Sequence, residues 1–198
     1  MLKEDIHEDL NADNNINKFI NKGRTIVSHN IQHILPTLDE NKANLSLLYM
    51  NEKLDIFGLS ETFLNPTNCK DKSHELKLND YDYPSRKDQI RMEGGGLLVY
   101  FKSGIKYERK NNIESSSVES MWFEIFPKYE KSFLICFVHR PPDSPSIWHT
   151  NFENEIINAS IMNKEIIFLG DLNIDYLKRV LTSWESIFTT HGFFSDDS

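Results

Sequence analysis

The chain has 198 residues, of which 39% are hydrophobic and 12% aromatic, and its formal net charge at neutral pH is -8. This length suits one domain with a sizeable core, since domains commonly contain roughly 100–200 residues. The acidic charge argues against a protein that holds nucleic acid by bulk electrostatic attraction, because such proteins usually carry a basic surplus.

The charge is unevenly distributed along the chain. Residues 1–14 carry one basic and five acidic side chains, whereas residues 86–110 carry seven basic and three acidic ones. The second segment is compatible with a local basic face on an acidic protein. Ordinary solvated loop charges explain it equally well.

Cysteine usage and hydropathy indicate a soluble intracellular protein, with nucleus and cytoplasm not distinguished. Cys69 and Cys136 lie far apart, and no Cys or His pair has zinc-finger spacing, so two free thiols in a reducing compartment are expected. The longest apolar run, 133–138, is far shorter than the roughly 18 residues that cross a bilayer. We expect no membrane association and no obligate protein partner.

The predicted elements begin after an acidic, Asn-rich leader. Residues 1–23 are expected to be poorly ordered, with a short helix around Ile16 to Ile20, and residues 24–198 are expected to form the domain. The domain opens with a strand, an amphipathic helix and a second buried strand, which is a βαβ-like beginning. The ranges predicted for these three elements are 25–30, 35–54 and 54–60.

The remaining predicted elements are three successive strands followed by a helix, a strand and a helix. Residues 64–93 form a long polar stretch without a clear period, which is typical of a functional or disordered loop. Two of the later strands flank a turn-prone segment and suggest a hairpin or a meander. The predicted strands are 97–101, 118–126, 132–138 and 165–169, and the predicted helices are 148–161 and 176–190.

The last predicted strand ends in the most informative short motif of the chain. Gly170-Asp171-Leu172-Asn173 follows an apolar run, and it places an acid and an amide on the same face of an extended segment. Such a pair at an exposed strand end can begin a metal and phosphate site. A strand that runs into an ordinary Gly-Asp turn is the alternative.

Four polar segments, each following a predicted strand, resemble the endonuclease/exonuclease/phosphatase superfamily when they are taken in order. They are Asn30, Ser60-Glu61-Thr62, His139-Arg140-Pro141-Pro142 and Gly170-Asp171-Leu172-Asn173. The closest resemblance is to the endonuclease domains of non-LTR (LINE-type) retrotransposons. Arg86, the run Gly94 to Tyr100, the run Glu119 to Glu124 and the run Gly170 to Leu177 also resemble that subgroup.

The resemblance covers about residues 25–193 and implies a fold and an activity. The implied fold is of the α/β (α+β) class, a four-layer α/β sandwich of two packed mixed β-sheets flanked by helices, with the site at the strand ends. The implied activity is phosphodiester hydrolysis of DNA with Mg²⁺ or Mn²⁺. Carboxylate and amide oxygens suit these hard cations, and no Cys or His cluster favours zinc.

Residue by residue, the resemblance assigns Glu61 as the acidic metal ligand and Asn30 as the amide beside the metal and the phosphate. Asp171 matches the carboxylate that orients or deprotonates the attacking water. Asn173 matches the amide that holds a phosphate oxygen and stabilises developing charge.

Three further positions have implied roles at the phosphate. His139 stands where the family usually has a tyrosine whose hydroxyl faces the phosphate, and an imidazole can also donate a hydrogen bond there. A lone histidine at a strand end is more often structural. Arg86 and Arg140 are expected to contact phosphate or DNA, so weakly held DNA is the expected partner.

The chain departs from the family pattern after its last motif. The family continues through further strands to a closing Ser-Asp-His motif, whereas this sequence ends at Ser198, and Ser195-Asp196-Asp197 lies too close to Asp171 for those strands to intervene. We therefore expect an incomplete domain in which the last strands of the second sheet are missing. Little or no nuclease activity is expected, because losing one member of a concerted set commonly removes most of the rate.

Two other functions remain open. The chain can be a phosphatase or phosphodiesterase of the same superfamily that acts on a nucleotide, an RNA end or a phosphoinositide, with residues 64–93 controlling the choice. It can also be a catalytically inert interaction module that keeps the sandwich and a vestigial metal site.

Overall fold

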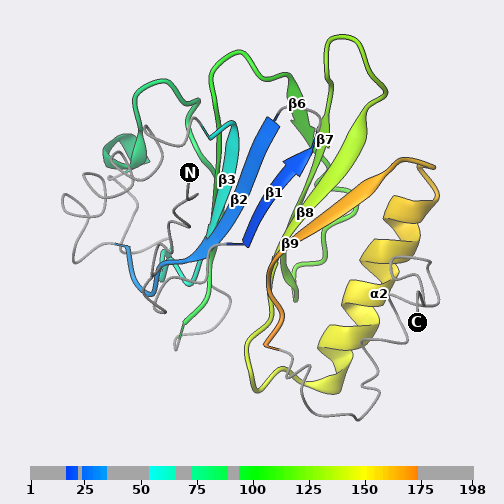
Figure 1. The fold of residues 1–198 in the computed structure, drawn as a ribbon. Helices are drawn as coiled ribbons and strands as arrows, with labels where there is room; N and C mark the ends of the chain where they lie inside the picture. Colours follow the sequence, from blue (N-terminus) through cyan, green and yellow to red (C-terminus); the bar gives the residue numbers. More distant parts are fainter. Residues whose placement is uncertain (1–16, 22–23, 35–53, 66–72, 89–93, 174–198) are drawn as a thin grey trace, which may run out of the picture.

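The computed structural model describes residues 17–21, 24–34, 54–65, 73–88 and 94–173. Within these ranges two β-sheets pack face to face, and a long α-helix lies on the outer face of the second sheet (Figure 1). The expected pairing of two mixed sheets is therefore confirmed.

The first sheet has five strands in the order β1-β2-β3-β5-β4. β2 and β3 run parallel, and the other neighbours run antiparallel. The strands are β1 (Asn17–Asn21), β2 (Arg24–Asn30), β3 (Ile56–Ser60), β4 (Ser85–Lys87) and β5 (Leu97–Phe101).

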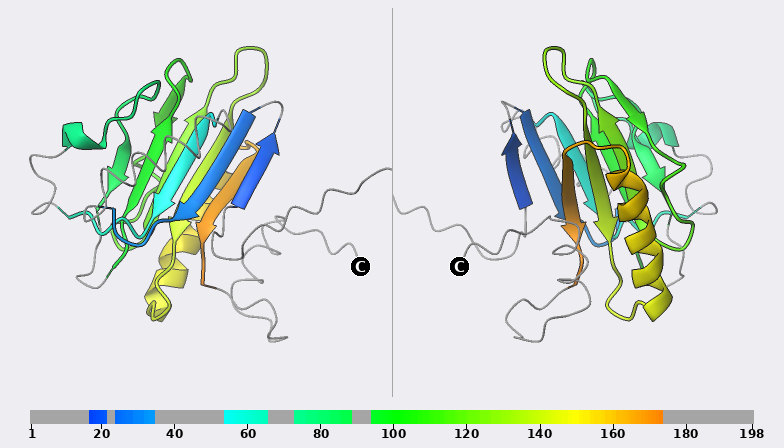
Figure 2. Two further views of the ribbon diagram at one scale, coloured as in Figure 1. Left: turned by 60° about the vertical axis from the view of Figure 1, so that its left-hand side comes forward. Right: turned by 90° about the vertical axis from the view of Figure 1, so that its right-hand side faces the viewer.

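The second sheet has four strands in the order β6-β7-β8-β9. β7 and β8 form the predicted hairpin, while β8 and β9 run parallel and are connected through the helix α2 (Ser146–Ser160). The strands are β6 (Tyr107–Arg109), β7 (Glu119–Ile125), β8 (Phe133–His139) and β9 (Ile166–Asp171). β2 and β9 run past each other across the interface between the sheets (Figure 2).

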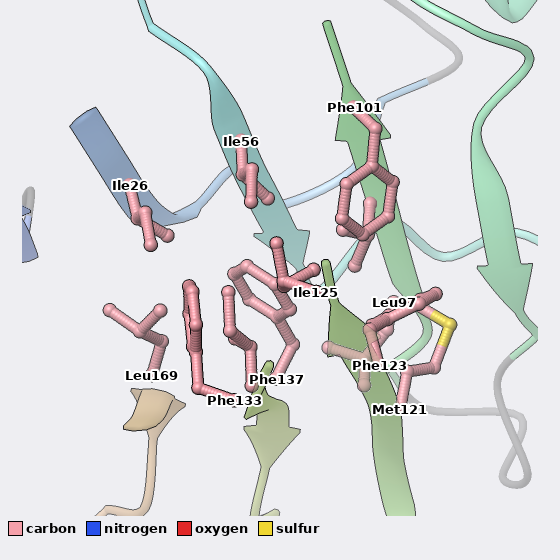
Figure 3. Close-up of a cluster of buried hydrophobic side chains, with 12 residues drawn as sticks. Ile26, Ile56, Leu97, Phe101, Met121, Phe123, Ile125, Phe133, Phe137 and Leu169 are labelled. Atoms are coloured by element: carbon pink, nitrogen blue, oxygen red, sulfur yellow. The ribbon is translucent and has the colours of Figure 1, made fainter. Parts of the chain in front are cut away.

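The core between the sheets is built from alternate residues of each strand. In β8, Phe133, Ile135 and Phe137 point toward the first sheet, whereas Leu134 and Cys136 point toward α2. Every residue of β7 and β8 is buried, because both faces of these strands are covered. Figure 3 shows the inner cluster, in which aromatic rings of the second sheet meet aliphatic side chains of the first.

One glycine sets how closely the two sheets approach. A β-carbon at Gly58, in the middle of β3, would overlap the ring of Phe137 in β8. The ring therefore occupies the space that any other residue at position 58 would need.

Gly58→Ala is expected to reduce the free energy of unfolding by about 2 kcal/mol, because overpacking forces a side chain from its rotamer or moves the backbone. The loss should be smaller when Phe137→Leu is also present, since the shorter side chain frees that space. Urea denaturation of the wild type, the two single variants and the double variant measures how far the two losses of free energy of unfolding depend on each other. Equal losses in both backgrounds would show that the contact is not the cause.

A buried glutamate in α2 fixes the helix to the second sheet. Glu155 accepts hydrogen bonds from the Ser115 amide at 2.6 Å, the Ser120 hydroxyl at 2.6 Å and the Trp122 indole at 2.8 Å. Burial raises the pKa of Glu155, against the effect of these three donors. The outer face of β7 is thus tied to α2 by polar as well as apolar contacts.

A second acidic side chain joins β7 to the segments that flank it. Glu124 forms ion pairs with Lys110 and Lys164, both at 2.8 Å. Burial alone would raise the pKa of Glu124, but hydrogen bonds from Lys110, Lys164 and Ser132 outweigh it and lower the pKa from 4.5 to about 2. Glu124 therefore stabilises the fold only where it is ionised.

Glu124→Gln is expected to reduce the free energy of unfolding at pH 7 by about 2 kcal/mol. A carboxyl whose pKa is lower in the folded state stabilises at pH values above its unfolded pKa. The difference between variant and wild type should therefore close as the pH falls from 4.5 toward 2. Denaturant titrations of both proteins across this pH range measure the difference in free energy of unfolding.

Glu108→Gln is the matched control, because Glu108 pairs with the same Lys110 at 2.9 Å but its side chain is 60% exposed. Its removal should change stability by less than about 0.5 kcal/mol. A Glu124 effect that persists unchanged at pH 2 would contradict the ion-pair explanation.

The outer face of the first sheet carries its own apolar cluster. It includes Val27, Phe57 and Tyr100 from the strands, and Leu76 from the 3-10 helix η1 (Ser73–Leu76) packs on it. The helix predicted for residues 35–54 would lie in this part of the chain, but residues 35–53 are outside the described ranges.

The structure confirms the predicted strands and the helix after β8 to within a few residues, and it corrects two expectations. The short helix around Ile16 to Ile20 is wrong, because residues 17–21 form β1 and pair with β2. Residues 64–93 are not an irregular loop throughout, since η1 and β4 lie within them. β6 was not predicted.

Several sequence predictions lie wholly or partly outside the described ranges. They include the helix at 176–190 and Cys69, whereas Cys136 is a buried free thiol. The division of the chain at residue 24 stays a prediction. None of the helices in the described part of the chain is long and apolar enough to cross a membrane.

Candidate active site

The polar strand ends meet at one end of the core between the sheets. In the second sheet Glu119, His139 and Asp171 are direct neighbours across β7, β8 and β9. Residues paired in this way point to the same face, which here is the face of Phe137 and Leu169. The row therefore faces the first sheet, where β2 and β3 end.

Asn30 and Glu61 form the half of the site that the first sheet supplies. Asn30 ends β2, and its side-chain amide donates a 2.8 Å hydrogen bond to Glu61 Oε1. Glu61 follows β3 and has a φ of 53°, a left-handed conformation that is uncommon outside glycine. The Glu61 carboxylate and the Asn30 side-chain amide are thereby held side by side, with Glu61 half-buried, while Asn30 Oδ1 accepts a 3.3 Å hydrogen bond from the Gln32 amide.

Asp171 and Asn173 form the other half, at the end of β9. The Asn173 backbone amide donates to Asp171 Oδ1 at 2.9 Å, which is an Asx-type turn. The Asn173 side chain donates to the Arg140 carbonyl at 2.7 Å, and Arg140 Nη1 donates to the Leu172 carbonyl at 3.1 Å. The segments after β8 and β9 are thus tied together, as their parallel pairing predicts.

The glycine of the motif is required by this arrangement. Gly170 has a φ of 142°, and a β-carbon there would overlap the Val138 carbonyl on the neighbouring strand. The last motif therefore begins with glycine for a steric reason, and Asp171 is positioned directly beside β8.

His139 connects the two halves. Its ring is buried, with a side chain only 3% exposed, and Nδ1 lies 2.8 Å from Glu119 Oε2. A carboxylate only accepts hydrogen bonds, so Nδ1 carries the proton. Among the residues that the structure describes, Nε2 has no hydrogen-bond partner, and it lies 3.4 Å from Glu61 Oε1.

The surrounding charge favours the protonated imidazole. Burial lowers the pKa of His139, but the hydrogen bond and charge of Glu119, with the charges of Glu61 and Asp171, outweigh burial and raise it above 6.5. A strand-end histidine that looks structural in the sequence is therefore at the centre of the acidic cluster.

Glu119 is the residue that sequence reasoning missed. It was noted as part of a family-like run, but no role was assigned to it. A charged side chain at the start of β7, before the apolar run Met121 to Phe123, was the available signal, because a buried carboxylate needs a partner. Besides His139, Glu119 accepts a 3.1 Å hydrogen bond from the Gly96 amide, and a β-carbon at Gly95 would overlap its carboxylate.

A cavity of about 160 Å³ opens at this polar end of the core. Glu61 and His139 lie on its wall, which places the expected metal ligand and the imidazole against the same space. The full lining is Glu61, Gly94, Gly95, His139, Pro141, Pro142 and Asp143.

The described contacts do not bring Arg86 to this cluster. Arg86 makes a two-pronged ion pair with Asp88 at 2.7 Å, and it is opposite Leu98, whose side chain belongs to the outer cluster of the first sheet. Its phosphate- or DNA-binding role stays a prediction, as does that of Arg140.

Other basic side chains of the segment 86–110 also form ion pairs with acidic residues. Lys87 and Arg109 pair with Glu114 at 3.6 and 2.8 Å, and Lys110 pairs with Glu124. These pairs weaken the case for a local basic face, because Glu114 and Glu124, which both lie outside the segment, together offset two charges of its surplus.

The donor set suits a hard cation. No group of three His, Cys, Asp or Glu side chains in the described part of the chain is arranged to hold a metal. Mg²⁺, however, is commonly held by one or two carboxylates and completes its shell with water and substrate phosphate oxygens. Glu61 and Asn30 supply oxygen ligands of that type, so the residues present fit Mg²⁺ or Mn²⁺.

Glu119→Gln is expected to lower the pKa of His139 below its wild-type value, because burial is then opposed by fewer negative charges. NMR titration of the imidazole carbon-bound protons in EDTA measures this, with unchanged far-UV circular dichroism as the check on folding. Glu108→Gln, at a mostly exposed carboxylate, should leave the pKa unaltered. An unchanged pKa in Glu119→Gln would contradict the assigned hydrogen bond.

A family model described as "Endonuclease/Exonuclease/phosphatase family" matches residues 27–195. The comparison with curated proteins gave no significant match. Among solved structures, the endonuclease domain of TRAS1, described as a telomere-specific non-LTR retrotransposon, matches with a TM-score of 0.61 and 12% identity. The match covers 84% of this chain and 70% of that domain.

Two further structures have the same fold. The Xenopus laevis APE2 catalytic domain has a TM-score of 0.53 and 18% identity, covering 75% of this chain and 58% of that one. The AP endonuclease LMAP from Leishmania major has a TM-score of 0.56 and 16% identity, covering 75% and 55%. At these identities the likeness shows the fold alone.

Proposed function

The chain belongs to the endonuclease/exonuclease/phosphatase family, and on that premise we propose that it hydrolyses phosphodiester bonds in DNA with a divalent metal. The observation that carries the proposal is the meeting of Asn30 and Glu61 with Asp171 and Asn173 around the buried His139. The fold shared with the TRAS1 endonuclease domain supports an endonuclease of retrotransposon type.

In this proposal Glu61 and Asn30 hold Mg²⁺ or Mn²⁺. The cation supplies polarisation of the phosphate and acidification of a coordinated water when it is bound. Asp171, whose Oδ1 is fixed by the Asn173 backbone amide, accepts the proton of the attacking water. The carboxylate needs such a fixed orientation, because proton transfer requires a short and aligned hydrogen bond.

Asn173 and His139 stabilise the phosphate in this reading. The Asn173 side chain has two N–H groups, and the bond to the Arg140 carbonyl uses one of them. The other can donate to a phosphate oxygen. Protonated His139 donates from Nε2, while Nδ1 remains on Glu119, so the imidazole takes the part that a tyrosine hydroxyl has in the family.

For the whole domain we propose the four-layer sandwich of the family, with a helix on the outer face of the first sheet. The apolar cluster of Val27, Phe57 and Tyr100 on that face supports it, because such a surface requires a cover. This part of the proposal concerns residues that the structure leaves undescribed.

The two alternative functions, a relative that acts on another phosphoester and an inert interaction module, predict different results. A relative that acts on another phosphoester would cleave a nucleotide, an RNA end or a phosphoinositide faster than DNA. An inert interaction module would bind Mg²⁺ in calorimetry and hydrolyse none of these compounds.

Nicking of supercoiled plasmid in Mg²⁺ tests the proposal. Cleavage is expected to stop in EDTA and to fall about a hundredfold or more in Glu61→Gln and Asp171→Asn, because each variant removes a charge that the reaction uses. The expectation of weak activity stays a prediction, and the same assay measures the wild-type rate.

Glu108→Gln should retain the wild-type rate, since Glu108 is mostly exposed and pairs with Lys110. Cleavage that survives in EDTA, or in both active-site variants, would come from a contaminant or another site and would overturn the proposal. Hydrolysis of no phosphoester at all would leave the inert module as the explanation.

A further inference from the structure

We propose that the stacked rings of His33 and Phe63 form a platform for an unpaired nucleobase beside the cleaved phosphodiester. The inference rests on the proposed function and deepens it, since it assigns the substrate to nucleic acid rather than to phosphoesters in general. It also predicts which state of the nucleic acid is bound.

The two rings form a layered pair at the surface. Their centroids are 4.9 Å apart and their planes differ by 30°, which is a stacked arrangement. Phe63 is half-buried and His33 is exposed. The imidazole is therefore the outer layer, and the phenyl ring supports it from the protein side.

The pair lies beside the candidate active site. Phe63 follows Glu61 by two residues, and a β-carbon at Gly94 would meet the Phe63 ring at 3.4 Å. Gly94 in turn lines the cavity together with Glu61 and His139. Gly94 thus connects the cavity to Phe63, on which His33 stacks.

The backbone holds both rings in place before any ligand binds. The His33 amide donates to the Glu61 carbonyl at 2.8 Å, and the Phe63 amide donates to the Gly95 carbonyl at 2.9 Å. His33 and Phe63 have φ values of 80° and 56°, so each stands in the sparsely populated left-handed region. Such conformations persist where surrounding contacts impose them, and they cluster at ligand sites.

The chemistry of the pair selects a nucleobase. Histidine and phenylalanine rings are common stacking partners for unstacked bases, and each such contact contributes substantially to binding. A phosphoinositide or a simple phosphate ester has no aromatic face to offer. Within a duplex both faces of a base are already stacked, so the platform favours a single-stranded or extruded nucleotide.

Oligonucleotide binding measured in EDTA tests this inference separately from the proposed hydrolysis, which needs a divalent metal. Three fluorescent probes of equal length and charge per strand are compared: a single-stranded oligothymidylate, an abasic tetrahydrofuran strand, and the thymidylate paired in a duplex. The wild-type chain is expected to bind the single-stranded thymidylate about tenfold more tightly than the abasic strand. The duplex should also bind more weakly than the single strand.

His33→Asn is the key variant, because asparagine tolerates a positive φ but has no aromatic ring. It should reduce the preference for thymidylate over the abasic strand to about twofold or less. His33→Tyr restores a ring and should restore the preference, which a purely structural role for His33 would not do. Tyr129→Ala, at an aromatic side chain that is 86% exposed in another loop, should leave the preference unchanged.

Equal binding of the thymidylate and abasic strands by the wild type would overturn the inference. A preference that His33→Asn leaves intact would overturn it as well. If plasmid nicking fails while the base preference and its loss in His33→Asn are observed, the proposed hydrolysis is wrong and the platform stands.

Discussion

The face-to-face packing of two sheets in a fixed register is the constraint on which the rest of the structure depends. Strand alternation sends Phe137 and Leu169 into the interface, and Gly58 leaves room for the phenyl ring between the sheets. His139 and Asp171 are two positions further along the same strands, so they face the same interface. The candidate active site is the polar end of the core between the two sheets.

The charges at that end follow from the same packing. Glu61 from the first sheet and Glu119 and Asp171 from the second surround one buried imidazole. Carboxylates gathered at the edge of a core are costly unless protons, donors or a cation offset their charge. His139 supplies part of that offset, and a divalent cation on Glu61 would supply more. Under the proposed function, an acidic chain would hold a phosphate without an extended basic surface.

The sequence predicted the strands well where a run of apolar residues, buried in the structure, indicated their position. It failed for β1, in which three of the five residues are polar and which is a strand because it pairs with β2. β4 and β6 have three residues each, too few for any period, and they too exist through pairing. The positions of the polar residues at strand ends were predictable, because a polar side chain after an apolar run is a local signal.

By itself the sequence determined the family and the four polar strand ends, because alternation and short motifs are properties of neighbouring residues. Only the tertiary structure decided that Glu119 holds His139, that Arg86 pairs with Asp88 outside the cluster, and that His33 stacks on Phe63. Most of these contacts depend on strand register between segments far apart in the chain. A shift of one residue in that register would turn every side chain to the other face of its sheet.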